Sequence, residues 1–143
     1  MDCTFCAIVE GRSPAEVVFE DEETMAFMDI HPANPGHTLV IPKRHARDIY
    51  ELNEETAAAV MRTAVKVAKA IREALKPDGV NLLQSNGSAA GQVVPHFHMH
   101  IIPRWHGDGL RLARPPLVRK TAVIKDTAAK IRAHLAPCSP PEG

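Results

Sequence analysis

The most constraining feature of the chain is a seven-residue segment in which histidine alternates with apolar residues. It reads His96-Phe97-His98-Met99-His100-Ile101-Ile102. Alternate side chains of a β-strand point to the same face, so we predict a strand over residues 96–102 with its three histidines on one face. Neighbouring histidines would then be about 6.6 Å apart and the outer two about 13 Å apart. This spacing is too wide for all three to bind one metal ion, so the row is expected to serve more than one site.

A polar strand face that simply meets solvent is the alternative explanation for such a row. Three histidines at strict period two favour a functional site, because imidazole acts as nucleophile, proton donor or metal ligand near neutral pH. The segment just before the row, residues 85–92, is rich in Ser, Asn, Gly and Ala. Small residues let backbone N–H groups approach a phosphate closely. The loop and the row together therefore predict chemistry at phosphorus.

The pattern of apolar and turn-forming residues predicts five strands and two helices. The strands are expected over residues 17–19, 24–29, 37–42, 80–84 and 96–102, and the helices over residues 54–75 and 122–135. Residues 1–12 are expected to form a short knuckle around two cysteines. Three strands in series with short connections indicate a mainly antiparallel sheet, and hence an α+β fold. The length of 143 residues suits a single domain, placed at residues 1–137 with a tail over 138–143.

Charge and hydropathy exclude several classes of partner. Seventeen basic residues balance seventeen acidic ones, so nothing calls for a nucleic acid polymer or an anionic membrane surface. No stretch approaches the ~20 apolar residues of a membrane span, and the first ten residues do not resemble a signal peptide. These features predict a cytoplasmic protein. Disulfide frameworks belong to small secreted domains, which favours metal or redox chemistry for Cys3 and Cys6 and a free thiol at Cys138.

The alternating segment resembles the signature of the histidine triad (HIT) family of nucleotide hydrolases and transferases, and most closely its bacterial Hint-like branch. The likeness spans roughly residues 3–110 and includes segments 27–30, 36–45, 86–87, 91–92 and 102–104. The resemblance implies a five-stranded, mainly antiparallel sheet with two α-helices, in agreement with the pattern above. It also implies a purine nucleotide substrate and a homodimer, with the long helix as the expected interface.

By the same resemblance, His98 is the nucleophile that takes a nucleoside monophosphoryl group. His100 would contact the phosphate or the scissile bridging atom, and the main-chain carbonyl of His96 would fix the tautomer of His98. Asp29 corresponds to the acid that binds the ribose hydroxyls. The base pocket corresponds to Phe5, Ile8, Phe27 and Ile30, and the phosphate loop to Ser85, Gly91 and Gln92. Phe5, Ile8 and Phe27 would equally suit an ordinary core.

Two positions depart from the pattern of the phosphoramidase branch. Ser85 stands where that branch usually has Asn, and Val93 stands where it usually has Ser, so a hydroxyl for the leaving group is missing. The reaction is expected to survive because His98, His100 and the backbone donors remain. The leaving-group preference and the rate are the properties that these changes affect. Among the other histidines, His37 is expected to have a buried hydrogen-bonding role rather than a catalytic one.

The pair Cys3-x-x-Cys6 by itself fits a zinc half-site, a redox pair or no function. A structural zinc ion takes four Cys or His ligands in a tetrahedron. The resemblance supplies the other two, because several bacterial members of the family bind zinc through residues that correspond to His45 and His96. No strand–helix context for a thioredoxin-type motif surrounds the pair, which disfavours a redox role. A structural zinc ion is therefore expected.

The expected function is a nucleotidyl hydrolase that cleaves purine nucleoside phosphoramidates or adenylates through a nucleotidyl-histidine intermediate. One alternative is a Fhit-like hydrolase of dinucleoside polyphosphates, and another is a nucleotide- or zinc-binding regulator without turnover. A sugar-phosphate nucleotidyltransferase is disfavoured, because that branch usually carries Gln at the position of His100. The zero net charge disfavours a DNA-deadenylating member.

Overall fold

The computed structural model describes residues 3–112, 126, 129 and 132–133. Two compact units are distinguished, one up to Leu110 and one from Arg111 onward, and the first contains the entire described sheet. The predicted single domain over residues 1–137 stays a prediction. The expected helix over residues 122–135 and the tail over 138–143 lie almost wholly outside the described residues. Within the described part, no helix has the length and apolar character to cross a membrane.

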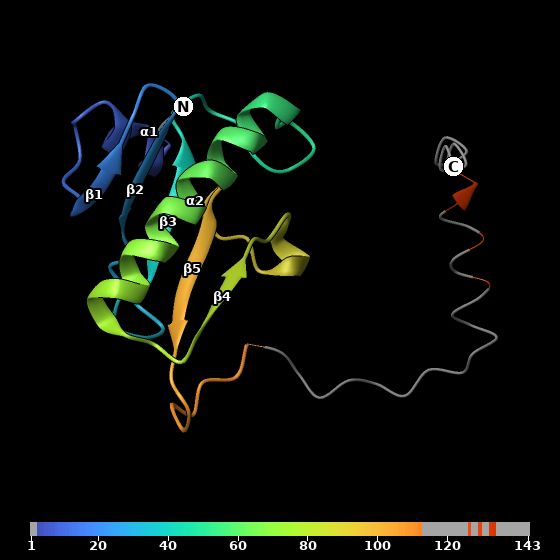
Figure 1. The fold of residues 1–143 in the computed structure, drawn as a ribbon. Helices are drawn as coiled ribbons and strands as arrows, with labels where there is room; N and C mark the ends of the chain where they lie inside the picture. The colour runs from blue at the N-terminus through green and yellow to red at the C-terminus, as the bar shows by residue number, and fades with distance from the viewer. Residues whose placement is uncertain (1–2, 113–125, 127–128, 130–131, 134–143) are drawn as a thin grey trace, which may run out of the picture. The chain divides into compact units, whose positions relative to one another are not determined.

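The first unit is a five-stranded antiparallel sheet with helices on both faces (Figure 1). Its elements are α1 (Thr4–Val9), β1 (Val17–Glu20), β2 (Thr24–Met28), β3 (Thr38–Pro42), α2 (Glu54–Leu75), β4 (Gly79–Leu83), the 3₁₀ turn η1 (Ser88–Ala90) and β5 (Met99–Arg104). The strand order is β1-β2-β3-β5-β4, and all four neighbouring pairs are antiparallel. The predicted α+β fold with a five-stranded antiparallel sheet is confirmed.

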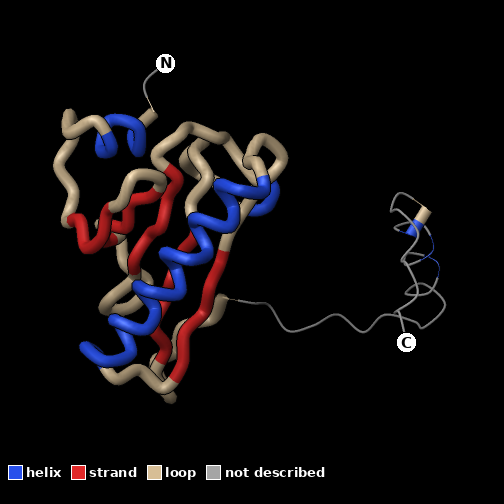
Figure 2. The backbone as a smooth tube through the Cα atoms, turned by 45° about the horizontal axis from the view of Figure 1, so that its top comes forward, coloured by secondary structure: helices blue, strands red, loops and turns tan. Residues whose placement is uncertain are grey.

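Helix α2 begins and ends at the residues that its sequence pattern predicts. The Asn53 side chain accepts a hydrogen bond from the Thr56 N–H at 2.7 Å, which satisfies one of the free donors of the first turn. Lys76 ends the helix in the left-handed conformation. The helix lies across one face of the sheet (Figure 2). Its buried stripe packs on apolar side chains of β2, β3 and β5 and comprises Ala59, Val60, Thr63, Ala64, Val67 and Ile71.

The opposite sheet face is covered by α1, a helix that the sequence analysis did not predict. The first twelve residues were expected to form an irregular knuckle, but residues 4–9 form a helix whose N-cap is Cys3. The Cys3 sulfur accepts a hydrogen bond from the Cys6 N–H at 3.4 Å, a capping role for which Ser, Thr, Asp or Asn is the usual signal. Phe5 of α1 is buried in a second core cluster with Met25, Phe27, Leu39 and Ile41.

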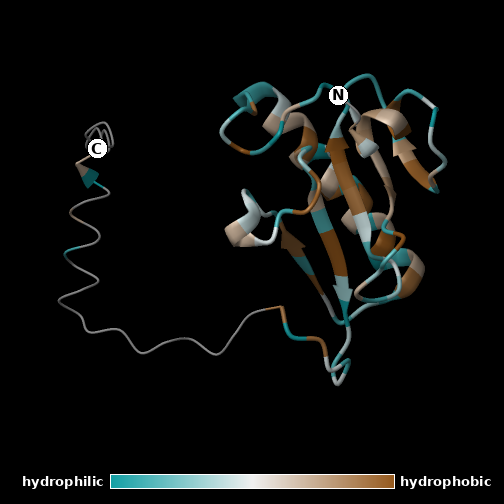
Figure 3. Ribbon diagram, turned by 180° about the vertical axis from the view of Figure 1, so that it is seen from behind, coloured by the Kyte–Doolittle hydropathy of each residue, from teal (hydrophilic) through white to brown (hydrophobic). Residues whose placement is uncertain are grey.

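The sheet thus has an apolar core on each side, because β2 and β3 alternate their side chains between the two helices. Ala26 and Val40 face α2, whereas Phe27 and Leu39 face α1. Figure 3 shows the hydrophobic residues running along the central strands and the hydrophilic ones gathered in the connecting loops. The near-continuous apolar runs of these strands follow from burial on both faces.

The histidine row only partly belongs to a strand, and the predicted start at residue 96 is wrong. β5 begins at Met99, which pairs with Val40, so His96 and His98 precede the regular strand. The chain there makes other backbone hydrogen bonds, since the Phe97 N–H donates to the carbonyl of Ala46 at 2.7 Å. The period-two arrangement nevertheless leaves Phe97 in the core under α2, while His96 and His98 lie on the side of α1.

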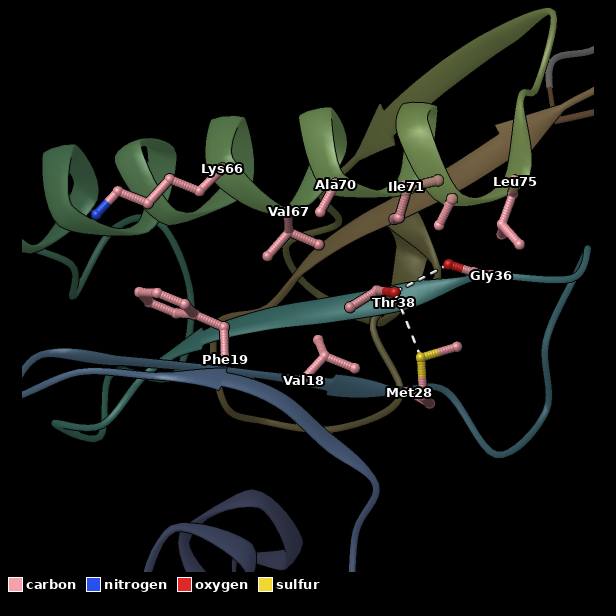
Figure 4. A pocket seen from close by; sticks show the side chains of 11 residues that line it. Val18, Phe19, Met28, Gly36, Thr38, Lys66, Val67, Ala70, Ile71 and Leu75 are labelled. Carbon is pink, nitrogen blue, oxygen red and sulfur yellow. Dashed lines mark hydrogen bonds between the residues drawn. The ribbon is translucent and has the colours of Figure 1, made fainter.

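An apolar groove of about 300 Å³ runs between the C-terminal half of α2 and strands β1 to β3 (Figure 4). At one end, Gly36 faces the side chain of Leu75 across the groove. Gly36 has φ +88°, and a Cβ built on it would lie 2.5 Å from Cδ1 of Leu75 and 3.0 Å from Cγ of Pro103. The backbone conformation therefore favours glycine, and an added Cβ would displace the end of the Leu75 side chain.

We predict that Gly36→Ala lowers the free energy of unfolding by about 1–3 kcal/mol, because alanine is strained at this positive φ. Urea unfolding followed by circular dichroism measures the change. Gly79→Ala is the matched control, since a Cβ at that position meets nothing within 4 Å and its φ is not positive. Equal stabilities of the two variants would contradict the prediction.

Candidate active site and metal-ligating cluster

A cleft of about 420 Å³ opens on the α1 side of the sheet. It contains most of the residues that the sequence analysis assigned to substrate. Those in its lining are Phe5, Ile8, Phe27, Asp29, Ile30, Gly91, His98 and His100. Ser85 and Gln92 are absent from the lining. One concave site is thus formed by helix α1, the end of β2, the loop before β5 and the first residues of β5.

His98 lies at the inner wall of this cleft with a defined tautomer. Its Nδ1 is 2.7 Å from the main-chain carbonyl oxygen of His96, and its side chain is buried. A carbonyl only accepts hydrogen bonds, so Nδ1 carries a proton, and in the neutral imidazole Nε2 keeps its lone pair. The ring of Phe5 meets the imidazole edge-on at a centroid distance of 5.2 Å. His98 is therefore held in one orientation with an unprotonated nitrogen.

His100 lies beside His98, with ring centroids 4.9 Å apart, and belongs to a second polar group. Its Nδ1 is 2.9 Å from Nε2 of His37, which is in turn 3.4 Å from Oδ2 of Asp29. The other carboxylate oxygen of Asp29 accepts a hydrogen bond from the His31 N–H at 2.8 Å. The buried hydrogen-bonding role expected for His37 is what the structure shows.

Burial keeps the two imidazoles of this group uncharged. Desolvation, together with the nearby His98 and His37, lowers the pKa of His100 to about 4, although Asp29 acts in the opposite direction. Desolvation also lowers the pKa of His37, again against the attraction of Asp29. Both residues are consequently neutral near pH 7, so each carries one proton and can both donate and accept.

Two side-chain amides, those of Asn86 and Gln92, fix the loop before the histidines through hydrogen bonds to the backbone. The Gln92 side chain donates to the carbonyls of Arg47 and Val94 at 2.7 and 3.0 Å and accepts from the Gly87 N–H at 2.8 Å. Both the oxygen and the nitrogen of the Gln92 amide are engaged by the backbone, so this side chain fixes the conformation of the loop. Asn86 similarly accepts from the Ile49 N–H at 2.7 Å. Three residues of this segment line the cleft: Gly91, Val94 and the 89% exposed Val93.

Two cysteines and two histidines form a separate cluster behind the cleft. Cys3 Sγ is 3.3 Å from Nδ1 of His96, Cys6 Sγ is 3.3 Å from Nδ1 of His45, and the two Nδ1 atoms are 3.2 Å apart. All four ligand atoms lie within 4.8 Å of one another. Tetrahedral zinc with ordinary Zn–S and Zn–N bonds has ligand–ligand edges of about 3.3–3.8 Å, so the cluster has the donor atoms and spacing for that ion.

The outer nitrogen of His96 strengthens this fit. Its Nε2 lies 2.8 Å from the carbonyl oxygen of Pro42, an arrangement that places the proton on Nε2 and leaves Nδ1 free to act as a ligand. Such carbonyl partners orient metal-bound histidines in many proteins. Burial lowers the pKa of His96, and the neutral ring is the form that binds metal.

A second group, formed by Asp29, His37 and His100, also brings three ligand atoms together, but its chemistry does not suit a metal ion. The Ala33 N–H donates to Nδ1 of His37 at 3.0 Å, which leaves the ring proton on Nε2, the nitrogen that faces the group. A metal at that position would have to displace this proton and leave an anionic ring. This group therefore acts through hydrogen bonds.

Some of the cleft lining escaped the sequence analysis. The structure adds Ser13, Pro14, Ala15 and Val94, which belong to the turn after α1 and to the segment before the histidines. No pattern in the sequence marks them, because they reach the cleft only through the packing of α1 on the sheet. Val93 was singled out from the sequence, and the structure places it in the cleft lining beside the histidines.

Comparisons with known proteins agree on one relationship. A family model described as the HIT domain matches residues 10–107. The chain is 45% identical over 104 residues to the adenosine 5'-monophosphoramidase hnt1 of Schizosaccharomyces pombe, covering 73% of this chain and 75% of that one.

Two solved structures share the fold. A HIT family protein of Bacillus subtilis superposes with a TM-score of 0.88 and 40% identity, over 96% of this chain and all of the other. A zinc-bound histidine triad family protein of Mycobacterium smegmatis superposes with a TM-score of 0.75 and 39% identity, over 93% of this chain and 97% of the other.

We predict that acidification from about pH 7 to about pH 5 destabilises the wild type more than His100→Gln. His100 titrates near 6.5 in the unfolded chain and near 4 in the folded one. Between these two pH values the unfolded state binds more protons than the folded state. The contribution of His100 to the free energy of unfolding is therefore fully present above about pH 6.5 and is lost as the pH falls toward 4.

Urea unfolding at the two pH values measures this difference. The variant lacks the titrating ring but keeps the Cys/His cluster, so any acid effect on that cluster cancels in the comparison. An equal loss of stability in both proteins would contradict the assignment of a depressed pKa to His100.

Proposed function

Because the chain belongs to the HIT family, we propose that it is a nucleotide hydrolase that cleaves purine nucleoside phosphoramidates or adenylates at the α-phosphate. The observation that carries the proposal is the tautomer of His98, whose Nδ1–H is held by the His96 carbonyl at 2.7 Å while Nε2 remains unprotonated in the cleft. A neutral imidazole nitrogen of this kind is a nucleophile ready for attack.

In the proposed first step, Nε2 of His98 forms a bond to phosphorus and the bond to the leaving group breaks with its electron pair. Water then attacks phosphorus, the bond to Nε2 breaks with its electron pair returning to His98, and the nucleoside monophosphate and a proton are released. His98 does not need to lose a proton before attack, because its only ring proton lies on the far nitrogen, bound to the His96 carbonyl. Hydrogen bonds to the non-bridging oxygens stabilise the charge that develops there.

The cleft offers separate surfaces to the parts of a nucleotide. Apolar side chains of Phe5, Ile8, Phe27 and Ile30 suit a purine base, and the carboxylate of Asp29 suits ribose hydroxyls. The nearby Gly91 has φ +92° and lets the loop backbone approach a phosphate. Ser85 and Gln92 do not line the cleft, so in this proposal they support the loop and do not contact the substrate.

The leaving group is proposed to be an amine in a phosphoramidate or a carboxylate in an acyl adenylate. The amine is supported by a relative that is 45% identical and is named an adenosine 5'-monophosphoramidase. Val93 offers no hydroxyl to that group, which keeps a dinucleoside polyphosphate hydrolase as the second candidate. A regulator without turnover is the third, and the intact pair of His98 and His100 counts against it. The absence of nucleic acid and membrane partners and a cytoplasmic location stay predictions from composition.

We also propose that Cys3, Cys6, His45 and His96 bind a structural zinc ion. The ligand-atom distances of 3.2–3.6 Å and the zinc-bound relative from Mycobacterium smegmatis support this assignment. All four tetrahedral positions would be filled by protein atoms, so the ion would fix α1 to the sheet and would not meet substrate.

A homodimer is proposed from the exposed edge of the sheet. β4 is an edge strand, and all five of its residues are exposed, including Val80, Leu82 and Leu83. Helix α2 packs on β2, β3 and β5 and itself exposes Met61 and Val65. A second copy that pairs along β4 and α2 would satisfy the free strand edge and cover these side chains.

We predict that His98→Asn lowers kcat for adenosine 5'-phosphoramidate by at least about a thousandfold, because the variant lacks the ring nitrogen that is proposed to attack phosphorus. The dissociation constant for adenosine monophosphate should change by less than about threefold, because the base and ribose contacts remain. Steady-state kinetics and calorimetry measure the two quantities. A lysyl adenylate and a diadenosine polyphosphate, assayed in parallel, distinguish the candidate leaving groups.

The control for this variant is His106→Asn, which changes an exposed histidine that does not line the cleft. It should keep the kinetics of the wild type. Turnover of the phosphoramidate by His98→Asn at a rate close to the wild type would refute the nucleophile assignment.

We predict that protein purified under reducing conditions carries about one zinc ion per chain, and that Cys6→Ser loses it and melts at a lower temperature. Inductively coupled plasma mass spectrometry and thermal unfolding measure the two effects. Cys138→Ser is the matched cysteine control and should retain the ion. A wild-type protein free of zinc, or a Cys6→Ser variant with full zinc content, would rule out this site.

A further inference from the structure

We propose that the apolar groove beside α2 is a second binding site, which takes an unbranched medium-chain carboxylic acid with its alkyl chain in the groove and its carboxylate at Lys66. The groove lies on the face of the sheet that α2 covers, whereas the candidate active site lies on the side of α1 (Figure 4). Met28, at the end of β2, is the only described residue that lines both. Binding at the groove therefore does not depend on the proposed hydrolase activity.

The groove has the length and width of one alkyl chain. It follows α2 from Lys66 at one end to Leu75 at the other (Figure 4). These residues are nine positions apart, which at 1.5 Å per residue is about 13.5 Å, the length of an extended chain of about ten carbons. Spread over this length, the volume of about 300 Å³ gives a mean cross-section of roughly 20 Å², that of a single hydrocarbon chain. An α-helix, which is about 10 Å wide with its side chains, does not fit into such a groove.

The wall of the groove is apolar and partly open to solvent. Side chains of β1, β2 and the C-terminal half of α2 form it, and among them Val18 and Leu75 are 53% and 42% exposed. An alkyl chain in the groove would cover this apolar surface. Thr38 adds no polar partner for a ligand, because its hydroxyl donates to the Gly36 carbonyl at 2.9 Å. The proposed dimer leaves the groove open, since β4 lies at the opposite edge of the sheet from β1.

Lys66 is the one charged residue of the described lining, and it selects an anionic head group. Its Nζ lies 5.4 Å from the centre of the Phe19 ring. Within the described part of the chain, no carboxylate oxygen lies within 4.0 Å of this nitrogen. The nearby Asp21 is engaged in its own turn, where Oδ1 accepts hydrogen bonds from the N–H groups of Glu23 and Thr24. A cation at the end of an apolar groove is complementary to a carboxylate at the end of an alkyl chain.

The first experiment measures binding of hexanoate, octanoate, decanoate and dodecanoate to the full chain by calorimetry, below the concentrations at which they form micelles. Each methylene that enters the groove should raise the affinity about fourfold. We therefore expect a steep rise from hexanoate to decanoate and a much smaller gain for dodecanoate, whose last carbons extend beyond the groove.

The second experiment places the chain and the head group with two pairs of variants. Ala70→Leu fills the groove and should weaken decanoate at least about tenfold, whereas Ala58→Leu changes an exposed alanine of α2 outside the groove and should leave it unchanged. Lys66→Met should weaken decanoate about threefold to fivefold and leave decanol within about twofold, because only the carboxylate loses its partner. Lys69→Met, on the same helix but outside the groove, is the matched charge control. Equal unfolding free energies within each pair would show that the variants fold alike.

Several results would overturn the proposal. One is a wild type that does not bind decanoate, which is also the result expected if another segment of the chain or a second copy fills the groove. Another is an affinity that does not depend on chain length, or an equal loss in Ala70→Leu and Ala58→Leu. A third is an equal effect of Lys66→Met on decanoate and decanol, which would remove the role of Lys66. Turnover of nucleotides plays no part in these measurements, so a failure of the proposed function leaves them unaffected.

Discussion

The fully buried imidazole and carbonyl of His96 connect the parts of the molecule on which the site depends. Its Nδ1 faces the two cysteine sulfurs, its Nε2 donates to the Pro42 carbonyl of β3, and its own carbonyl accepts from His98. One residue therefore joins the N-terminal helix, the central sheet and the proposed nucleophile. Because each of its polar groups is used, a change in its position would disturb both the cluster behind the cleft and the tautomer within it.

The double-sided sheet explains why a small chain can build a deep site. Strands β2 and β3 are buried on both faces, with α2 on one side and α1 on the other. The side of α2 is a conventional apolar core. The side of α1 is only partly filled, and the remaining space is the cleft, whose walls are largely apolar. Apolar surroundings remove water from the imidazoles, which is why the pKa of His100 is depressed to about 4 and its ring remains neutral.

Much of the fold could be predicted from the sequence, because its signals are local. The pattern of apolar and turn-forming residues predicted the helix at residues 54–75, and three strands in series with short connections indicated the antiparallel sheet. The signals failed where a distant contact competes with a local preference. His96 and His98 continue the alternating pattern but leave the strand, since their segment bonds to the loop at Ala46. Residues 4–9 form a helix because Cys3 caps it and Phe5 is buried against Phe27.

The sequence by itself determined which chemical groups the chain offers: a row of histidines at period two, a paired cysteine motif and a loop of small residues. These depend on residue types and spacing, which are local properties. Only the tertiary structure decided how the groups are used. It brings Cys3 and Cys6 to His45 and His96 across more than thirty positions of the chain, and it places Ala33 against His37 and His37 against His100. The position of a proton on an imidazole depends on the partner of each nitrogen, and those partners come from segments that meet only in the folded chain.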